Sequence, residues 1–116
     1  MTHMICMVLP IHIISEANIR SHWRVKAIRV ASHREIASTM LRKHQPPPAP
    51  AKITITRIAP RELDDDNLAS GAKATRDGVA DWLGIDDGDK RLSWRYNQRR
   101  GKPGEYAAVV TVEWSA

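Results

Sequence analysis

Residues 61–90 read RELDDDNLASGAKATRDGVADWLGIDDGDK and carry most of the acidic side chains of the chain. Three consecutive aspartates, residues 64–66, precede a segment typical of one helix, and a second acidic group at residues 86–89 follows it. Side chains two apart on an extended approach to a helix lie on the same side, so we expect Asp64 and Asp66 to point at one spot. A glycine-containing loop after the helix is expected to return one carboxylate of the second group to that spot.

Converging carboxylates repel one another, and a divalent cation would relieve the repulsion. The nearby candidate ligands are all oxygen atoms, without cysteine or histidine, which favours magnesium or manganese over zinc. Calcium is disfavoured, because Leu68 stands where an EF-hand loop needs a polar ligand. The pattern therefore predicts a Mg²⁺ site, with Mn²⁺ as the other possible ion, and its candidate ligands are Asp64, Asp66, Asp87 and Asp86.

Both acidic groups also have simpler interpretations. Acids at the start of a helix complement its dipole, and Asn67 would then be the N-terminal cap of a helix that begins at Leu68. This role accounts for one acid but not for three in a row plus a second group, so a metal site is the preferred hypothesis. Asp86 and Asp87 also fit a solvated Asp-Gly turn, which the residues alone favour.

The charge distribution indicates a polyanionic partner. The chain has 116 residues, the size of one ordinary domain, and a formal net charge of +5. Residues 1–52 carry a charge of +6, residues 53–89 carry −5 and residues 90–116 carry +4. Basic arms attract a polyanion, and an acidic centre between them is best explained if it holds a metal that meets the phosphates.

The N-terminal sequence gives no indication of export or membrane insertion. Cys6 is the only cysteine, so an internal disulfide is excluded and a reducing cytoplasm is compatible. The apolar run at residues 4–14 is interrupted by Pro10 and His12, lacks the charged start of an export signal, and is too short to span a bilayer. We therefore expect a cytoplasmic protein without a membrane partner.

The remaining segments predict a single domain over residues 1–116, of α+β class, with a small mixed β-sheet and two main helices. β-Branched residues and apolar alternation indicate four strands, the last two joined as a hairpin. A proline-rich connector at residues 45–51 cannot continue a helix and separates the first helix from the second strand. In chain order we expect a strand at residues 4–14, a helix at 19–43, a strand at 52–58, a helix at 68–83, and strands at 92–98 and 106–114.

Each predicted helix has an expected inward face. In the second helix this face consists of Leu68, Ala72, Val79 and Leu83, with Trp82 beside it and Gly84 as the stop. In the first helix the expected inward residues are Ile28, Ala31, Ile36, Met40 and Leu41.

The predicted hairpin is strongly basic. Six basic residues lie between Lys90 and Lys102, with Trp94 and Tyr96 interleaved. Such a ribbon can bind phosphates and offer an aromatic surface to an unstacked base, although packing on the sheet is the preferred role for Trp94. The candidate DNA contacts are Arg91, Arg95, Arg99, Arg100 and Lys102.

The central stretch resembles the RusA-type Holliday junction resolvases, which are metal-dependent endonucleases of bacteria and their prophages. The resemblance is carried by three runs in a distinctive order, over about a third of the chain at motif level. They are D-x-D-N-L at residues 64–68, KATRD at residues 73–77, and the glycine loop that leads into residues 86 and 87.

The resemblance implies a homodimer of small α+β subunits that binds four-way DNA junctions and nicks two strands symmetrically, as in DNA recombination and repair. It implies that Asp64, Asp66 and Asp87 are the catalytic, metal-binding carboxylates, with Asp86 as the alternative to Asp87. It also implies that Lys73 is a catalytic cation near the scissile phosphate. The residues alone equally allow an i,i+4 pair between Lys73 and Asp77 on an exposed helix face.

Two other functions fit the same residues. One is a non-catalytic DNA-binding or junction-binding protein whose acids only stabilise the fold by pairing with its own basic residues. The other is a metal-dependent nuclease for another branched or single-stranded DNA.

Overall fold

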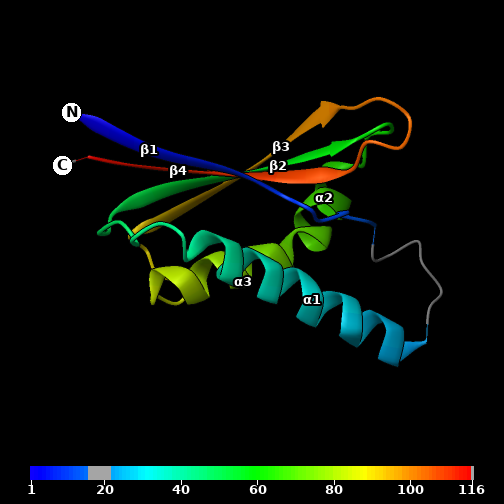
Figure 1. The fold of residues 1–116 in the computed structure, drawn as a ribbon, viewed down its shortest axis with the longest axis horizontal. Helices are drawn as coiled ribbons and strands as arrows, with labels where there is room; N and C mark the ends of the chain where they lie inside the picture. The colour runs from blue at the N-terminus through cyan, green and yellow to red at the C-terminus, as the bar shows by residue number, and fades with distance from the viewer. Residues whose placement is uncertain (16–21, 116) are drawn as a thin grey trace.

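A computed structural model of the chain describes residues 1–15 and 22–115, and it has four strands and three helices within these ranges. Helices α1 and α3 lie against one face of the sheet (Figure 1). The predicted class, a small α+β domain with a mixed sheet, is confirmed. The elements are β1 (Thr2–Leu9), α1 (Trp23–Leu41), β2 (Ala51–Ala59), α2 (Asp65–Gly71), α3 (Lys73–Leu83), β3 (Leu92–Arg100) and β4 (Ala107–Ser115).

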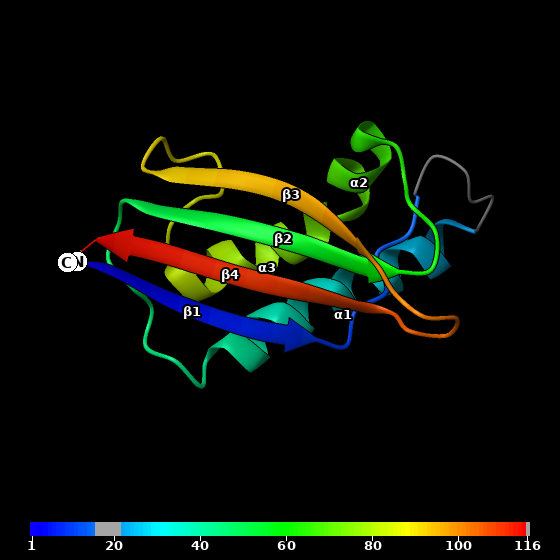
Figure 2. The ribbon, with the colours of Figure 1, turned by 90° about the horizontal axis from the view of Figure 1, so that it is seen from above.

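The strand order in the sheet is β1-β4-β2-β3, which contradicts the predicted hairpin of the last two strands. β2 lies between them, parallel to β3 and antiparallel to β4 (Figure 2). The connection after β3 crosses the end of β2, where the Gly101 amide donates to the Ala59 carbonyl at 2.9 Å. Polarity explains the order, because β2 buries its isoleucines on the helix side while the arginine-rich β3 is better tolerated at an edge.

The core lies between the sheet and the two long helices. Ile53 and Ile55 of β2 and Val110 and Val112 of β4 are fully buried, and their neighbours along each strand are partly exposed on the opposite face. The predicted inward face of the second helix is confirmed, because Leu68, Ala72, Val79, Leu83 and Trp82 are all buried. Gly84 ends α3 in the left-handed conformation at φ 71°, as predicted.

The first strand is shorter than predicted. β1 ends at Leu9 because Pro10 has no amide hydrogen to continue the pairing with β4. The chain then leaves the sheet, although Ile11 and Ile13 remain buried. The second strand and the proline-rich connector before it are confirmed, since β2 begins at Ala51.

Helix α1 packs differently from the prediction. Leu41 is buried and Ile36 and Met40 are half-buried, but Ile28 is 70% exposed and Ala31 is also exposed. α1 diverges from the sheet toward its N-terminal end, so only its C-terminal half contacts the core (Figure 1). Residues 19–21 of the predicted helix lie outside the described residues.

The single helix predicted for residues 68–83 is two helices, α2 and α3, separated at Ala72. Gly71 lies directly against the Ile14 carbonyl, where an added Cβ would overlap the oxygen, and the chain changes direction there. Asn67 lies inside α2, so its predicted role as the N-cap is wrong. Asp64 occupies that position, but its side chain makes no capping hydrogen bond.

Candidate functional site

Lys73, the first residue of α3, joins two aspartates. Its Nζ lies 2.7 Å from Asp77 Oδ1, one turn along the helix, and 2.8 Å from Asp87 Oδ2 in the loop after α3. The i,i+4 pair with Asp77 is therefore present. Lys73 also contacts Asp87, which is fourteen residues away in the sequence. This contact is one of those needed if Lys73 and the predicted metal ligands belong to one site.

Arg76 completes this cluster from the same helix. Its Nε donates to Asp87 Oδ2 at 2.8 Å, and its guanidinium lies 4.6 Å from the ring centre of Trp94. Its Nη1 also donates to the Tyr96 hydroxyl at 3.0 Å. We call Lys73, Arg76, Asp77 and Asp87 the ion-pair cluster. Arg76 was not among the predicted site residues, although its position three residues after Lys73 places it on a neighbouring part of the helix surface.

The ion pairs keep the cluster charged. The hydrogen bond from Lys73 lowers the pKa of Asp87 below its usual value, and the Arg76 charge acts in the same direction. The hydrogen bonds to Asp77 and Asp87 raise the pKa of Lys73. Trp94 supports the loop, because its Nε1 donates to the Asp87 carbonyl at 2.9 Å, and the predicted packing role of Trp94 is confirmed.

The first acidic group has a different environment. Asp64 is extended at φ −61° and ψ 153°, while Asp65 and Asp66 form the first turn of α2. The expectation that Asp64 and Asp66 share an extended segment is therefore wrong, and residues 65 and 66 are placed to complement the dipole of α2. All three side chains are exposed, and within the described parts of the chain none makes a hydrogen bond or ion pair.

The two acidic groups meet β3 at different points. The Gln98 amide holds the loop before Asp64, accepting from Leu63 N at 2.8 Å and donating to Leu63 O at 2.7 Å. The Asp87 loop is instead held at Trp94, four residues earlier, which is about 13 Å along a strand. The two acidic groups are therefore anchored at different points along β3.

The donor atoms of the two acidic groups have the chemistry that magnesium requires. Carboxylate oxygens are the ligands that Mg²⁺ prefers. Within residues 1–15 and 22–115, no three Asp, Glu, His or Cys side chains are grouped so that they could hold an ion. Asp87 is paired with two cations, and Asp86 Oδ2 accepts from the Gly88 amide at 3.1 Å, as the turn interpretation expects. A metal site shared by the predicted ligands therefore stays a prediction.

The candidate DNA contacts lie outside the ion-pair cluster. Arg91 is paired with Asp89 at 2.9 Å, and this partner lowers the pKa of Asp89 to about 2. Arg95 and Arg99 are exposed on the sheet face opposite Trp94 and Tyr96, and Lys102 is exposed in the loop after β3. Arg100 donates to the Pro60 carbonyl at 3.2 Å. These residues form a basic edge along β3.

A groove lies beside the ion-pair cluster. It has a volume of about 540 Å³ and runs between α1, the junction of α2 with α3, and Tyr96 of β3. Lys26 of α1 lines it together with Lys73 and Arg76, and Asp77 is the one acid in its lining. Its charged residues are therefore mainly basic, although most of its surface is apolar.

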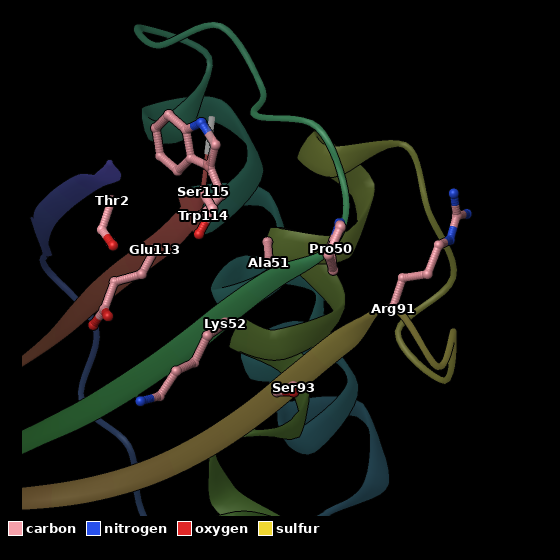
Figure 3. A pocket seen from close by; sticks show the side chains of 9 residues that line it. All are labelled: Thr2, Pro50, Ala51, Lys52, Arg91, Ser93, Glu113, Trp114 and Ser115. Carbon is pink, nitrogen blue, oxygen red and sulfur yellow. The ribbon is translucent and has the colours of Figure 1, made fainter.

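A second depression, of about 390 Å³, lies at the end of the sheet near both termini (Figure 3). Lys52, Glu113 and Arg91 are its charged residues. Figure 3 shows Arg91 directed away from Lys52 and Glu113, so these groups do not converge on a common point. We assign no site to it.

None of the helices in the described parts of the chain is long and apolar enough to cross a membrane. Comparison of the sequence with protein-family models and with curated proteins found no match.

Proposed function

We propose that this chain is a metal-dependent, structure-specific DNA endonuclease that resolves four-way junctions by paired symmetric nicks. The contact between Lys73 and Asp87 carries the proposal, because it joins two of the three runs of the RusA-like pattern. The groove beside this contact gives further support, since three of its four charged residues are basic and can contact a phosphate backbone.

The proposed roles follow from charge and exposure. Phosphodiester hydrolysis builds negative charge on the phosphate, and Lys73 and Arg76, which pair with Asp77 and Asp87 in this structure, are the cationic groups beside the groove. Asp64, Asp66 and Asp87, with Asp86 as the alternative to Asp87, are the proposed ligands of Mg²⁺ or Mn²⁺. Such an ion, when bound, lowers the pKa of a water molecule and neutralises phosphate charge.

The proposal includes a homodimer in the cytoplasm. Two symmetric cuts in one junction need two sites related by a two-fold axis, and a dimer of identical subunits supplies them. The basic edge of β3, with Arg95 and Arg99, is the proposed surface for the arms of the junction, together with Arg100, Lys102 and Arg91.

One observation favours a second function. The Asp87 carboxylate is neutralised by Lys73 and Arg76, as expected if the acids only stabilise the fold of a non-catalytic DNA-binding protein. That protein would bind junctions equally well with and without metal and would not cut them.

The test is cleavage of labelled four-way, flap and single-stranded DNA with Mg²⁺, with Mn²⁺ and with chelator. We expect paired nicks in the four-way junction only when metal is present, and their loss in Asp66→Asn while junction binding is retained. Asp65→Asn is the matched control, because Asp65 is an equally exposed neighbour in the same helical turn.

Three other outcomes are informative. Metal-dependent cleavage of flap or single-stranded DNA alone would support a nuclease activity but show that the four-way junction is not its substrate. Binding without cleavage in every metal would favour the non-catalytic function. Loss of cleavage in Asp65→Asn equal to that in Asp66→Asn would contradict the proposed choice of ligands.

A further inference from the structure

A buried arginine near the end of β2 has no acidic partner among the described residues. Arg57 is only 6% exposed, yet no carboxylate pairs with it in the described parts of the chain. Its Nε donates to the Ile13 carbonyl at 2.8 Å, and its Nη1 donates to the Arg61 carbonyl. These acceptors satisfy hydrogen bonds but are neutral, so the guanidinium charge remains uncompensated.

Such a charge is unfavourable in a protein interior. Buried charges are normally paired, because transfer of an ion from water into a poorly polarisable interior costs several kcal/mol. Burial accordingly lowers the pKa of Arg57. An arginine remains protonated even so, and an anion supplied from outside would restore the balance.

A pocket adjoins this guanidinium. It has a volume of about 200 Å³ and is lined by His12, Arg57, Ala59, Pro60, Arg61 and Tyr106. The lining holds two arginines and no acid. One water occupies about 30 Å³ of liquid, so the pocket has room for a tetrahedral anion and a few waters.

Two contacts hold the walls of the pocket. The His12 and Tyr106 rings lie 3.9 Å apart between their centres, and this contact joins the loop after β1 to the residue that precedes β4. Arg57 itself anchors the loop after β2 through the Arg61 carbonyl. A phosphate in the pocket would therefore meet a planar guanidinium fork fixed by its surroundings, which suits recognition of phosphate oxygens.

We propose that this pocket binds a phosphate group through Arg57, with Arg61, His12 and Tyr106 at its rim. The group comes either from free inorganic phosphate or from the backbone of a nucleic acid, and the chemistry of recognition is the same. The pocket is separate from the ion-pair cluster. Only the nucleic-acid source depends on the proposed function; binding of free phosphate does not.

The test is a ¹H–¹⁵N NMR titration of the whole chain with inorganic phosphate, with chloride adjusted to keep the ionic strength constant. We expect a saturable shift of the Arg57 Nε–H signal. Arg61→Ala is expected to weaken phosphate binding by roughly threefold to tenfold, as for loss of one rim charge. Arg24→Ala is the matched control, because it removes an exposed arginine of α1 that is not in the pocket lining.

Arg57→Met removes the buried charge with a side chain of similar length. Phosphate binding to the folded wild type is expected to raise its Tm. Arg57→Met is expected to abolish this rise, whatever the Tm of the variant without phosphate. If this variant does not fold, Arg61→Ala and the titration of the wild type decide the question. An Arg57 Nε–H signal that does not respond to phosphate, or responds equally to chloride, would overturn the proposal.

A second titration with a labelled oligonucleotide distinguishes the two sources. Weaker DNA binding by Arg61→Ala, with competition by inorganic phosphate, would assign the pocket to a backbone phosphate. Phosphate binding that leaves DNA affinity unchanged would assign it to the free anion, and the nuclease proposal would then be tested by cleavage alone.

Discussion

The two acidic groups of the chain differ in what surrounds them. Asp87 lies against Lys73 and Arg76, with its backbone carbonyl held by Trp94. Residues 64–66 are exposed, and within residues 1–15 and 22–115 their side chains contact no cation. Aspartates that look alike in the sequence therefore differ in environment, because the Asp87 carboxylate is already paired with two cations while those of residues 64–66 are exposed to solvent.

The largest expected effect is on cleavage. In the proposed enzyme, Asp64→Asn reduces the single-turnover nicking rate with Mg²⁺ by at least about a hundredfold, since removal of even a supporting residue of a metal ligand costs 10- to 100-fold. Asp81→Asn is the control, because Asp81 pairs with Arg34 and is not one of the proposed metal ligands. If Asp64→Asn nicks the junction as fast as Asp81→Asn does, Asp64 is not a ligand of the catalytic metal.

The next effect separates the two acidic groups by stability. Asp87→Asn lowers the free energy of unfolding by about 1–2 kcal/mol, because Arg76 would keep a partly buried charge without its partner. Asp65→Asn changes the same quantity by about 0.5 kcal/mol or less, because Asp65 is exposed and unpaired. Urea denaturation at neutral pH measures both. Equal losses in the two variants would contradict the contrast between the groups.

The pH dependence of unfolding sharpens this difference. The pKa of Asp87 is lowered by Lys73 in the folded chain, so its contribution to stability is present above the unfolded value of 3.8 and is lost as the pH falls through the folded value. Asp87→Asn should therefore lose less stability than the wild type between about pH 5 and pH 2. The urea midpoints of the wild type and of Asp87→Asn, measured over this pH range, test this prediction. If the two midpoints change in parallel with pH, the Asp87 ion pairs are not formed in solution.

The smallest expected effect is the helix pair of Lys73 with Asp77. Lys73 is 55% exposed, so water screens this pair, and a double-mutant cycle with Lys73→Met and Asp77→Asn should give a coupling of about 0.3–0.5 kcal/mol. The cycle of Lys73→Met with Asp87→Asn should give at least as much, since Asp87 is only 22% exposed. A larger coupling to Asp77 than to Asp87 would make Lys73 mainly a helix-surface residue.

Local patterns in the sequence predicted much of the fold. Strand β2 follows from the alternation of apolar and polar residues, and the end of α3 at Gly84 follows from the ability of glycine to adopt a positive φ. The buried residues from Leu68 to Leu83 follow from helical spacing. All three signals depend only on residues close together in the sequence. The pairing of β3 was not predictable in this way, because two consecutive strands with a turn between them suggest a hairpin unless the competing strand is considered. The break at Ala72 depends on the approach of Ile14 to Gly71, a contact between distant segments.

The candidate site was predictable to a smaller extent. The contact of Lys73 with Asp87 shows that the loop after α3 returns an acid to the start of that helix. The expected approach of this acid to Asp64 and Asp66 stays a prediction, since it depends on where Gln98 and Trp94 hold the two loops, which local sequence patterns do not specify. Arg57 was overlooked in the sequence, although the period of two along β2 places it on the same face as the buried Ile53 and Ile55.

Binding of Mn²⁺, followed by paramagnetic broadening of backbone amide signals, tests most directly whether the two acidic groups form one metal centre. We predict broadening at both Asp66 and Gly88 at the same low Mn²⁺ concentration, in the presence of a four-way junction, and its loss at both positions in Asp66→Asn. Broadening confined to one acidic group, or persisting unchanged in Asp66→Asn, would contradict a shared metal centre and leave the ion-pair cluster as a structural feature.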